Sequence, residues 1–191
     1  MPREILEQLF DPPVKVRLLK FFLRNSDQTF DLKKIVKRIK CDVSACRRQI
    51  NRLESIKLIN SKVKKGKKVY SVNPNFDFYT ELRTLVLKSS PASKKKIVQR
   101  LRGLGRINLA VLSGIFLNTE NARVDLLVVG ENIKKTKLSA FLRDLEAEVG
   151  KEIDYVVLTT EDFKYRYDMF DRFIRDVFEK PHEKLINRLK V

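Results

Sequence analysis

The chain has 191 residues, and its 41 Lys and Arg against 24 Asp and Glu leave a formal net charge of +17. A hydrophobic content of 43% with only six Gly and six Pro excludes collagen-like, intrinsically disordered and disulfide-scaffold proteins. The length suits one large domain or two small ones. The excess positive charge indicates a polyanionic partner.

The positive charge is confined to one half of the chain. Residues 1–105 carry 26 basic and 9 acidic side chains, a net of +17, whereas residues 106–191 carry 15 of each, a net of zero. This asymmetry is typical of a polyanion-binding module joined to a neutral domain. We therefore predict an α+β protein with two domains, residues 1–90 and residues 91–191.

The sequence shows no targeting or membrane signal. Its first residues mix acidic and basic side chains without the apolar run of a signal peptide. The longest nearly apolar stretch, residues 107–117, is 11 residues long, whereas a bilayer requires about 20. We expect a cytoplasmic protein with no membrane partner, in which Cys41 and Cys46 stay reduced.

The first half begins with three predicted helices. Apolar spacing after Pro12-Pro13 predicts a first helix that ends near residues 25–27. Asp31 is a candidate N-cap for a second helix over residues 32–39, which is basic on its outer side. Residues 40–42 interrupt this helix, and Val43-Ser44 begins a third.

The third helix is amphipathic in an unusual way. We expect Cys46, Ile50, Leu53 and the segment Ile56 to Leu58 to face the core. Its opposite side carries hydroxyl, amide and guanidinium groups on Ser44, Arg47, Arg48, Asn51 and Arg52. Two short helices joined by a turn, the second with such a face, are typical of a helix-turn-helix.

A lysine-rich hairpin is predicted directly after the third helix. Residues 59–72 alternate apolar and polar side chains on both sides of Gly66, which indicates two strands and a turn. Its tip carries four lysines, Lys64, Lys65, Lys67 and Lys68. These charges repel one another unless phosphates lie between them.

Residues 10–88 resemble the ArsR-type winged helix-turn-helix family. The resemblance implies that the third helix enters the major groove of double-stranded DNA and that the hairpin, the wing, lies along the backbone or minor groove. It assigns DNA contacts to Ser44, Arg47, Arg48, Asn51, Arg52, Lys64, Lys65, Lys67 and Lys68. Chemically, Arg can bond two acceptors of guanine, Asn can do the same on adenine, and Lys serves phosphate as a point charge. The alternatives are a winged helix that binds protein or RNA, or a basic face that is simply solvated.

Many ArsR-type proteins sense metals through cysteines, so Cys41 and Cys46 are candidate ligands. A metal site requires three or four such ligands, and the single histidine, His182, lies far away, at the expected start of the last helix. We therefore expect no metal and no cofactor, and we interpret both cysteines as small packing residues.

The second half combines helices with strands. A helix over residues 76–87, with Phe78, Leu82, Leu85 and Val86 at helical spacing, is expected to pack on the first domain or on a second copy of the chain. Residues 89–96 form the predicted linker, before a short helix from Ile97 that Gly103 and Gly105 end. Strand-like segments over 107–116, 124–129 and 153–158, with a helix over 136–149, predict a mixed sheet with helices.

Residues 95–190 resemble the minimal nucleotidyltransferase-like domain, whose fold is shared with DNA polymerase beta. Active members of that family hold a triphosphate on a Gly-Ser turn and two Mg²⁺ ions on three carboxylates, two of them in an Asp-x-Asp motif. Here Ser113-Gly114 is followed by Ile115 where the serine is expected. Arg123 stands at the first Asp position, Asp125 at the second, and Asp154 matches the third.

Arg123 decides the expected chemistry. A guanidinium in place of a metal-bridging carboxylate repels the cations that the reaction requires, so we expect no enzymatic activity. The resemblance then leaves a vestigial pocket formed by Ser113, Gly114, Arg123, Asp125 and Asp154, with an ion pair between Asp125 and Arg123. A retained nucleotide or small-ligand pocket, or an active nucleotidyltransferase whose winged helix holds an RNA or protein substrate, are the alternatives.

The last segment has an aromatic stripe at helical spacing. Its members are Phe163, Tyr167, Phe170, Ile174 and Val177, which suit either core packing on the sheet or a two-fold interface.

Taken together, these patterns predict a homodimeric, sequence-specific, double-stranded DNA-binding transcriptional regulator. Its catalytically inactive C-terminal domain is expected to serve dimerisation or effector sensing, and the sequence identifies no effector.

Overall fold

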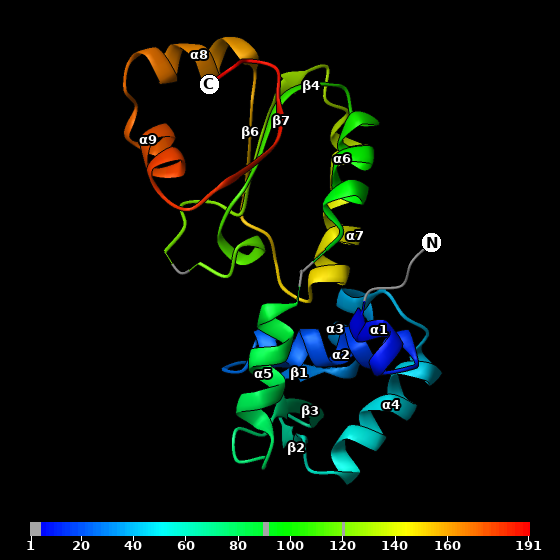
Figure 1. The fold of residues 1–191 in the computed structure, drawn as a ribbon. Helices are drawn as coiled ribbons and strands as arrows, with labels where there is room; N and C mark the ends of the chain where they lie inside the picture. The colour runs from blue at the N-terminus through cyan, green and yellow to red at the C-terminus, as the bar shows by residue number, and fades with distance from the viewer. Residues whose placement is uncertain (1–4, 90–91, 120) are drawn as a thin grey trace. The chain divides into compact units, whose positions relative to one another are not determined.

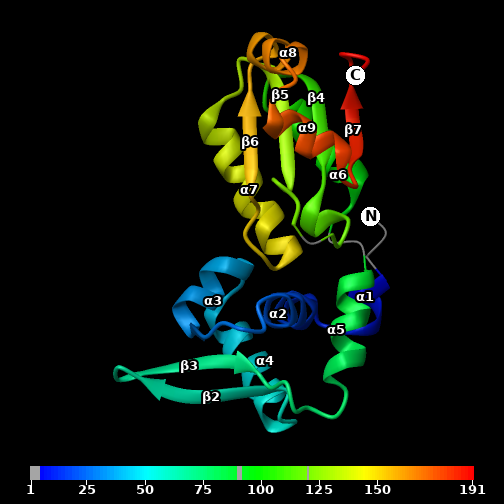
Figure 2. The same cartoon turned by 90° about the vertical axis from the view of Figure 1, so that its left-hand side faces the viewer.

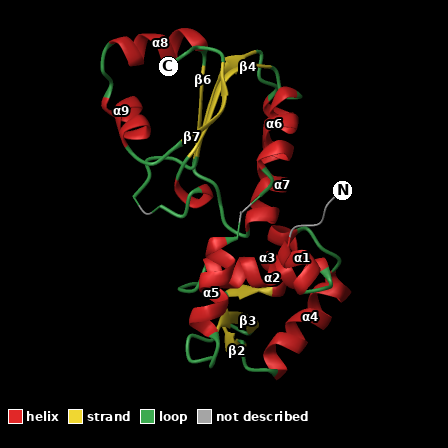
Figure 3. Cartoon of the chain, viewed as in Figure 1, coloured by secondary structure: helices red, strands yellow, loops and turns green. Residues whose placement is uncertain are grey.

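The computed structural model describes residues 5–89, 92–119 and 121–191 and combines helices with two β-sheets (Figure 3). The predicted α+β class is confirmed. The described residues group into two compact units, one formed by residues 5–89 with Asp144–Lys151 and the other by residues 92–143 with Glu152–Val191. The predicted boundary between residues 90 and 91 lies outside the described residues. None of the described helices has the length and apolar character that a bilayer crossing demands.

The first unit is a set of helices followed by a hairpin (Figure 1). Its three strands form an antiparallel sheet in the order β1-β3-β2. In chain order its elements are α1 (Ile5–Leu9), α2 (Pro13–Arg24), β1 (Phe30–Asp31), α3 (Leu32–Ile39), α4 (Val43–Ser55), β2 (Ile59–Lys64), β3 (Lys67–Val72) and α5 (Tyr79–Lys88).

Local sequence signals place the helix ends of this unit. Pro13 stands at the first position of α2, where a missing N–H costs nothing. The Asp31 carboxylate accepts a hydrogen bond of 2.7 Å from the Lys34 amide at the start of α3, and Asp42 caps α4 in the same way. The three helices predicted before the hairpin are therefore confirmed.

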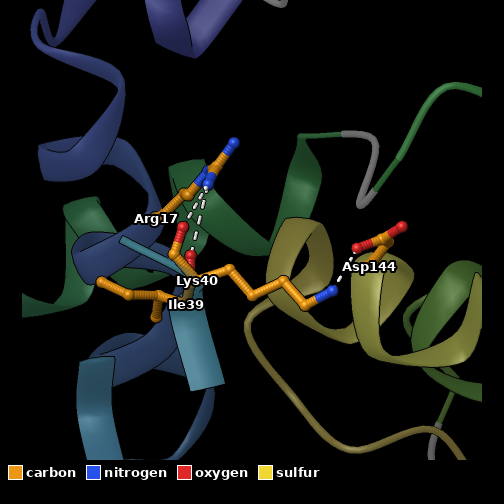
Figure 4. Close-up of polar contacts among 4 residues, drawn as sticks. All are labelled: Arg17, Ile39, Lys40 and Asp144. Carbon is orange, nitrogen blue, oxygen red and sulfur yellow. Dashed lines mark hydrogen bonds and ion pairs between the residues drawn. The ribbon is translucent and has the colours of Figure 1, made fainter. Parts of the chain in front are cut away.

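The end of α3 is fixed by contacts from within the same unit (Figure 4). Lys40 adopts a left-handed conformation with a φ of 49°, which stops the helix. Arg17 donates to the carbonyl oxygens of Ile39 and Lys40 at 3.2 and 3.3 Å, and Lys40 forms an ion pair with Asp144. Carbonyls that the helix leaves unpaired are thus satisfied, and the turn before α4 is held in place.

A tight turn joins the two long strands of the first sheet. Ile59 pairs with Val72 at one end of the hairpin and Lys64 with Lys67 at the other. Lys65 and Gly66 have φ values of 51° and 72°, the conformation that two-residue hairpin turns require. The predicted hairpin is confirmed, and its tip projects beyond the helices of the unit (Figure 2).

The core of the first unit is aromatic and aliphatic. Phe21 packs against Phe22 and Phe30 with ring centroids 5.4 and 4.6 Å apart. The same cluster contains Cys46, which is fully buried, while Cys41 is partly buried and packs against it. Among the described residues there is no group of His, Cys, Asp and Glu side chains that could hold a metal ion.

The second unit is a four-stranded mixed sheet with helices on both faces (Figures 1 and 2). The strand order is β6-β5-β4-β7, with β5 and β6 parallel and the other pairs antiparallel. Its elements are α6 (Lys94–Arg102), β4 (Arg106–Leu112), a short 3₁₀ helix (Gly114–Phe116), β5 (Leu126–Glu131), α7 (Lys135–Val149, whose end belongs to the first unit), β6 (Tyr155–Leu158), α8 (Thr160–Asp168), α9 (Arg172–Glu179) and β7 (Glu183–Asn187).

Helices α8 and α9 cover one face of this sheet. Alternate residues of β4 and β5 point to that face, because side chains along a strand alternate with a period of two. They pack against Phe163 of α8 and Ile174 and Val177 of α9, which are all buried. Core packing therefore accounts for these three members of the predicted aromatic stripe.

Several predicted boundaries in the middle of the chain are wrong. Ile56 was expected to face the core, yet it is 54% exposed, because α4 ends at Ser55 and Lys57 turns the chain with a φ of 63°. The helix predicted from residue 76 begins at Tyr79, and Phe78 and Leu85 are exposed. Helix α6 already begins at Lys94, within the predicted linker, whose residues 90 and 91 lie outside the described part.

The C-terminal predictions also need correction. The strand predicted to reach Phe116 ends at Leu112, before the 3₁₀ helix, and the next strand continues through Gly130 to Glu131. The aromatic stripe is interrupted between α8 and α9, where Phe170 is 77% exposed with a φ of 53°. His182 precedes strand β7, and not a last helix, because Glu183–Asn187 pairs with the edge of β4.

Candidate nucleic-acid interface

Helix α4 presents its predicted polar face to solvent. Cys46, Gln49, Ile50 and Leu53 are buried, and a helix repeats every 3.6 residues, so the positions between them must point outward. All five predicted contact residues of this helix are exposed: Ser44, Arg47, Arg48, Asn51 and Arg52.

The cationic groups of this face have no partners within the described part of the chain. The guanidinium groups of Arg47, Arg48 and Arg52 form neither an ion pair nor a hydrogen bond there, and the Asn51 amide is equally unbonded. Guanidinium groups offer several donors in a fixed plane. The face is therefore supplied with donors that no described residue satisfies.

The N-terminus of α4 is already occupied by a carboxylate. Asp42 accepts from the Ser44 hydroxyl and from the amides of Ser44 and Ala45, which lowers its pKa below the ordinary value. An open hollow of about 550 Å³ lies here, lined by Asp42, Val43, Ser44, Arg47, Arg48 and Asn51. Because the Ser44 hydroxyl already donates to Asp42, it is less available to an external partner than the neighbouring guanidinium groups of Arg47 and Arg48.

The lysines of the hairpin are divided between its two faces. Directly paired residues of neighbouring strands share a face, so Lys62, Lys64 and Lys67 lie on one side and Lys68 on the other. Lys64 and Lys67 face each other across the strands, next to Lys65 in the turn. The four predicted tip lysines are all exposed. Within the described part of the chain, only Lys68 among them has a bonding partner.

Glu54 binds the hairpin to α4. Its carboxylate accepts from the Ser61 hydroxyl of β2 and from the Lys68 ammonium of β3, the latter at 3.2 Å. The Ser61 hydrogen bond, followed by the interaction with Lys68, holds the pKa of Glu54 below its ordinary value. The Lys68 ammonium also lies 5.3 Å from the centre of the Tyr70 ring. Lys68 thus differs from the other three predicted tip lysines, because its ammonium already interacts with Glu54 and with the Tyr70 ring.

The sequence interpretation missed Lys62. It shares the hairpin face of Lys64 and Lys67, is exposed, and has no partner within the described part. Strict alternation along residues 59–64 would have assigned it to that face, because side chains two apart along a strand point to the same side.

Four residues of the predicted vestigial pocket come together in the second unit. Asp125 precedes β5 and Asp154 precedes β6, and these strands run parallel with Leu126 beside Tyr155. The buried Asp125 carboxylate accepts from the Ile115 amide at 2.8 Å and from the Asp154 amide at 2.9 Å. The Ser113 hydroxyl donates to the Val124 carbonyl.

Gly114 is required by this arrangement. Its φ is 54°, and a Cβ at this position would lie 2.0 Å from Oδ1 of Asp125. Glycine alone fits such a close approach in the left-handed region. The short turn after β4 is therefore built around the Asp125 carboxylate.

The predicted ion pair between Arg123 and Asp125 is wrong. Arg123 instead lies 4.0 Å from Asp176 of α9, with its side chain 57% exposed. Asp125 uses both carboxylate oxygens to bind backbone amides, while Asp154 is exposed. This pattern stabilises the turn, and among the described residues no group of carboxylates converges on a metal site.

A substitution of Glu54 tests how the hairpin is held. Because its folded pKa is lower than the unfolded value of about 4.3, its interactions stabilise the fold above that pH and are lost as the pH falls through the folded value. In Glu54→Gln this acid-dependent stabilisation should be absent. Urea unfolding between about pH 3 and 7 should show a shallower loss of unfolding free energy than in the wild type.

Glu81→Gln is the matched control, because Glu81 is exposed and has no partner within the described part. It should follow the wild-type pH dependence. An acid dependence of Glu54→Gln equal to that of the wild type would contradict the role of Glu54.

A pair of isosteric substitutions tests the Asp125 turn. Asp125→Asn places an NH₂ group against a backbone N–H, so one partly buried amide donor loses its acceptor at the buried side chain, at a cost of about 1–3 kcal/mol. Asp154→Asn changes an exposed carboxylate with no side-chain partner in the described part, so the effect should stay within about 0.5 kcal/mol. Chemical denaturation of both variants measures the difference, and equal stabilities would refute the structural role.

Comparisons with protein-family models, with curated proteins and with solved structures find no match for this chain.

Proposed function

We propose that the protein is a sequence-specific, double-stranded DNA-binding transcriptional regulator with an N-terminal winged helix-turn-helix domain. The observation that carries the proposal is the set of exposed cationic groups on α4 and on the hairpin that follows it, which have no partner among residues 5–89, 92–119 and 121–191. A binding surface for a polyanion requires such groups, because each phosphate contact releases condensed counterions from the nucleic acid.

The order of the elements supports a groove-reading role for α4. Helices α3 and α4 are joined by a short turn that Lys40 and Asp42 define, and the hairpin follows at once. In helix-turn-helix proteins the second helix lies in the major groove, which is wide enough to admit it. In this proposal α4 reads base edges and the hairpin acts as the wing.

The two parts of the surface differ in chemistry. Arg47, Arg48 and Asn51 can each make two parallel hydrogen bonds to one base, which distinguishes guanine and adenine from the other bases. The lysines of the hairpin carry flexible point charges, which suit phosphates and carry no sequence information. The proposal therefore assigns specificity to α4 and non-specific affinity to the hairpin.

Glu54 supports this division because it joins the two parts. An ordered hairpin costs less conformational entropy on binding than a free one. The bonds of Glu54 to Ser61 and Lys68 provide that order before DNA arrives. The Glu54 carboxylate is tolerated near the proposed DNA-binding surface because the Lys68 ammonium neutralises its charge.

The C-terminal domain, residues 91–191, is proposed to be a catalytically inactive nucleotidyltransferase-like domain that serves dimerisation or effector sensing. The bonding of Asp125 to two backbone amides and the pairing of Arg123 with Asp176 support this part of the proposal. The exposed Phe78 and Leu85 on and beside α5 support a homodimer, which would contact two half-sites about 10 base pairs apart or a multiple of that spacing.

Substitutions on α4 and on the hairpin should affect binding differently. Arg47→Ala and Arg48→Ala should each reduce the preference for a selected duplex over a scrambled one by about 1–3 kcal/mol, because a bidentate base contact is lost. Lys65→Ala should weaken binding to both duplexes alike and reduce the slope of log K against log salt by about 1. Fluorescence anisotropy across a salt series measures both quantities.

Arg166→Ala is the matched control, since Arg166 is exposed on α8 and its guanidinium has no partner in the described part. It removes the same charge outside the proposed surface and should leave preference and slope unchanged. Equal losses on both duplexes from all three test variants would contradict base reading by α4.

An assay for nucleotidyl transfer tests the rival function. With labelled ATP or CTP, Mg²⁺ and candidate RNA or protein acceptors, the proposal predicts no incorporation. Asp154→Asn serves as the control, because it removes a motif carboxylate without disturbing a described side-chain bond. Transfer by the wild type that Asp154→Asn abolishes would establish an enzyme in place of the proposed inactive domain.

A further inference from the structure

A pocket lies at α8 and α9 of the second unit, and its lining contains none of the residues of the Asp125 turn. Its volume is about 390 Å³, within the range of small-molecule sites in proteins. It is lined by Tyr167, Asp168, Phe170, Asp171, Ile174, Arg175, Phe178 and Glu179. The predicted aromatic stripe is interrupted between these two helices.

The aromatic lining of the pocket is exposed and partly strained. Phe170 is 77% exposed and Tyr167 43%. Phe170 also has a φ of 53°, a left-handed conformation that is unfavourable for a bulky side chain. This backbone conformation ends α8, because it lets the Asp171 amide donate to the Arg166 carbonyl at 2.9 Å. The exposed ring itself adds little to the core, so it is exposed apolar area on the pocket.

The charges of the lining leave one carboxylate unused. Asp171 caps α9 by accepting from the amides of Phe173 and Ile174. Glu179 pairs with Arg175 at 3.1 Å. Asp168 has neither a hydrogen bond nor an ion pair within the described part of the chain. The lining thus has three carboxylates and one guanidinium and is negative overall, and Asp168 is its carboxylate without a partner in the described part of the chain.

We propose that this pocket binds an organic cation that carries apolar or aromatic groups. The faces of aromatic rings attract cations, and Asp168 supplies the full counter-charge. The rings of Tyr167 and Phe170 supply exposed apolar contact area, while the Phe178 ring already has the Lys184 ammonium 5.1 Å from its centre. An anion of the same shape meets the electron-rich ring faces and a carboxylate, so the pocket selects by charge as well as by size. The site stands on its own geometry, independently of DNA binding.

Two ions of similar shape and opposite charge make the test direct. Tetraphenylphosphonium and tetraphenylborate are titrated separately into the full chain by isothermal calorimetry. The cation should bind at least about tenfold more tightly than the anion. General attraction to a chain of charge +17 would favour the anion, so it cannot produce this result.

Two substitutions locate the binding site. Asp168→Asn should weaken binding of tetraphenylphosphonium about tenfold. Phe170→Gly removes the ring and suits the left-handed backbone, so the fold is retained while binding of the cation falls by a similar factor. Asp77→Asn, at an exposed aspartate of the first unit without a described partner, should leave binding unchanged.

Circular dichroism confirms that each variant is folded before titration. Equal or tighter binding of tetraphenylborate by the wild type overturns the proposal. Wild-type affinity for tetraphenylphosphonium in both pocket variants also overturns it. A failure of DNA binding in the same protein has no bearing on these outcomes, because the two sites share no residue.

Discussion

The tip of the hairpin holds like charges close together, and the rest of the first unit must offset their repulsion. Lys64 and Lys67 face each other across the hairpin, with Lys65 between them in the turn. Like charges placed directly opposite each other destabilise a sheet. Backbone pairing along the hairpin and the link from Glu54 to Lys68 keep this region ordered in spite of the repulsion. A bound polyanion would relieve that repulsion, and the proposed function rests on this constraint.

The elements of the first unit were predictable because their signals are local. Asp31 and Asp42 mark helix starts through hydrogen bonds to amides two or three residues away, and a Lys-Gly pair between alternating strands marks a hairpin turn. The exposed face of α4 follows from helical spacing alone. By contrast, the pairing of Lys68 with Glu54 joins residues 14 apart on different elements, and no local pattern contains it.

The errors in the second unit have a common physical origin. A stripe from Phe163 to Val177 satisfies helical spacing, yet the chain breaks at Phe170 so that α8 and α9 can both pack on one sheet face. Segment 183–187 pairs with β4 because that sheet edge offers backbone partners, which sequence periodicity does not reveal. Likewise, the partner of Arg123 is Asp176, a residue 53 positions away on another helix.

Asp125 organises the turn that follows β4. A carboxylate with two backbone amide donors is a strong local organiser, and removal of one donor or acceptor leaves a buried group unpaired. The turn at Gly114 is built around this carboxylate, which explains why the position requires an aspartate. The sequence predicted that these residues meet, and in the structure Asp125 accepts hydrogen bonds from the Ile115 and Asp154 amides, while Arg123 lies apart against Asp176.

Selection of bound duplexes from a random DNA pool tests the central claim most directly. If α4 reads bases while the hairpin binds phosphates, repeated selection at moderate salt should enrich a short motif. The enriched duplex should outcompete both scrambled duplex and structured RNA. A pool that stays random after selection, or a preference for structured RNA over every selected duplex, would contradict the account.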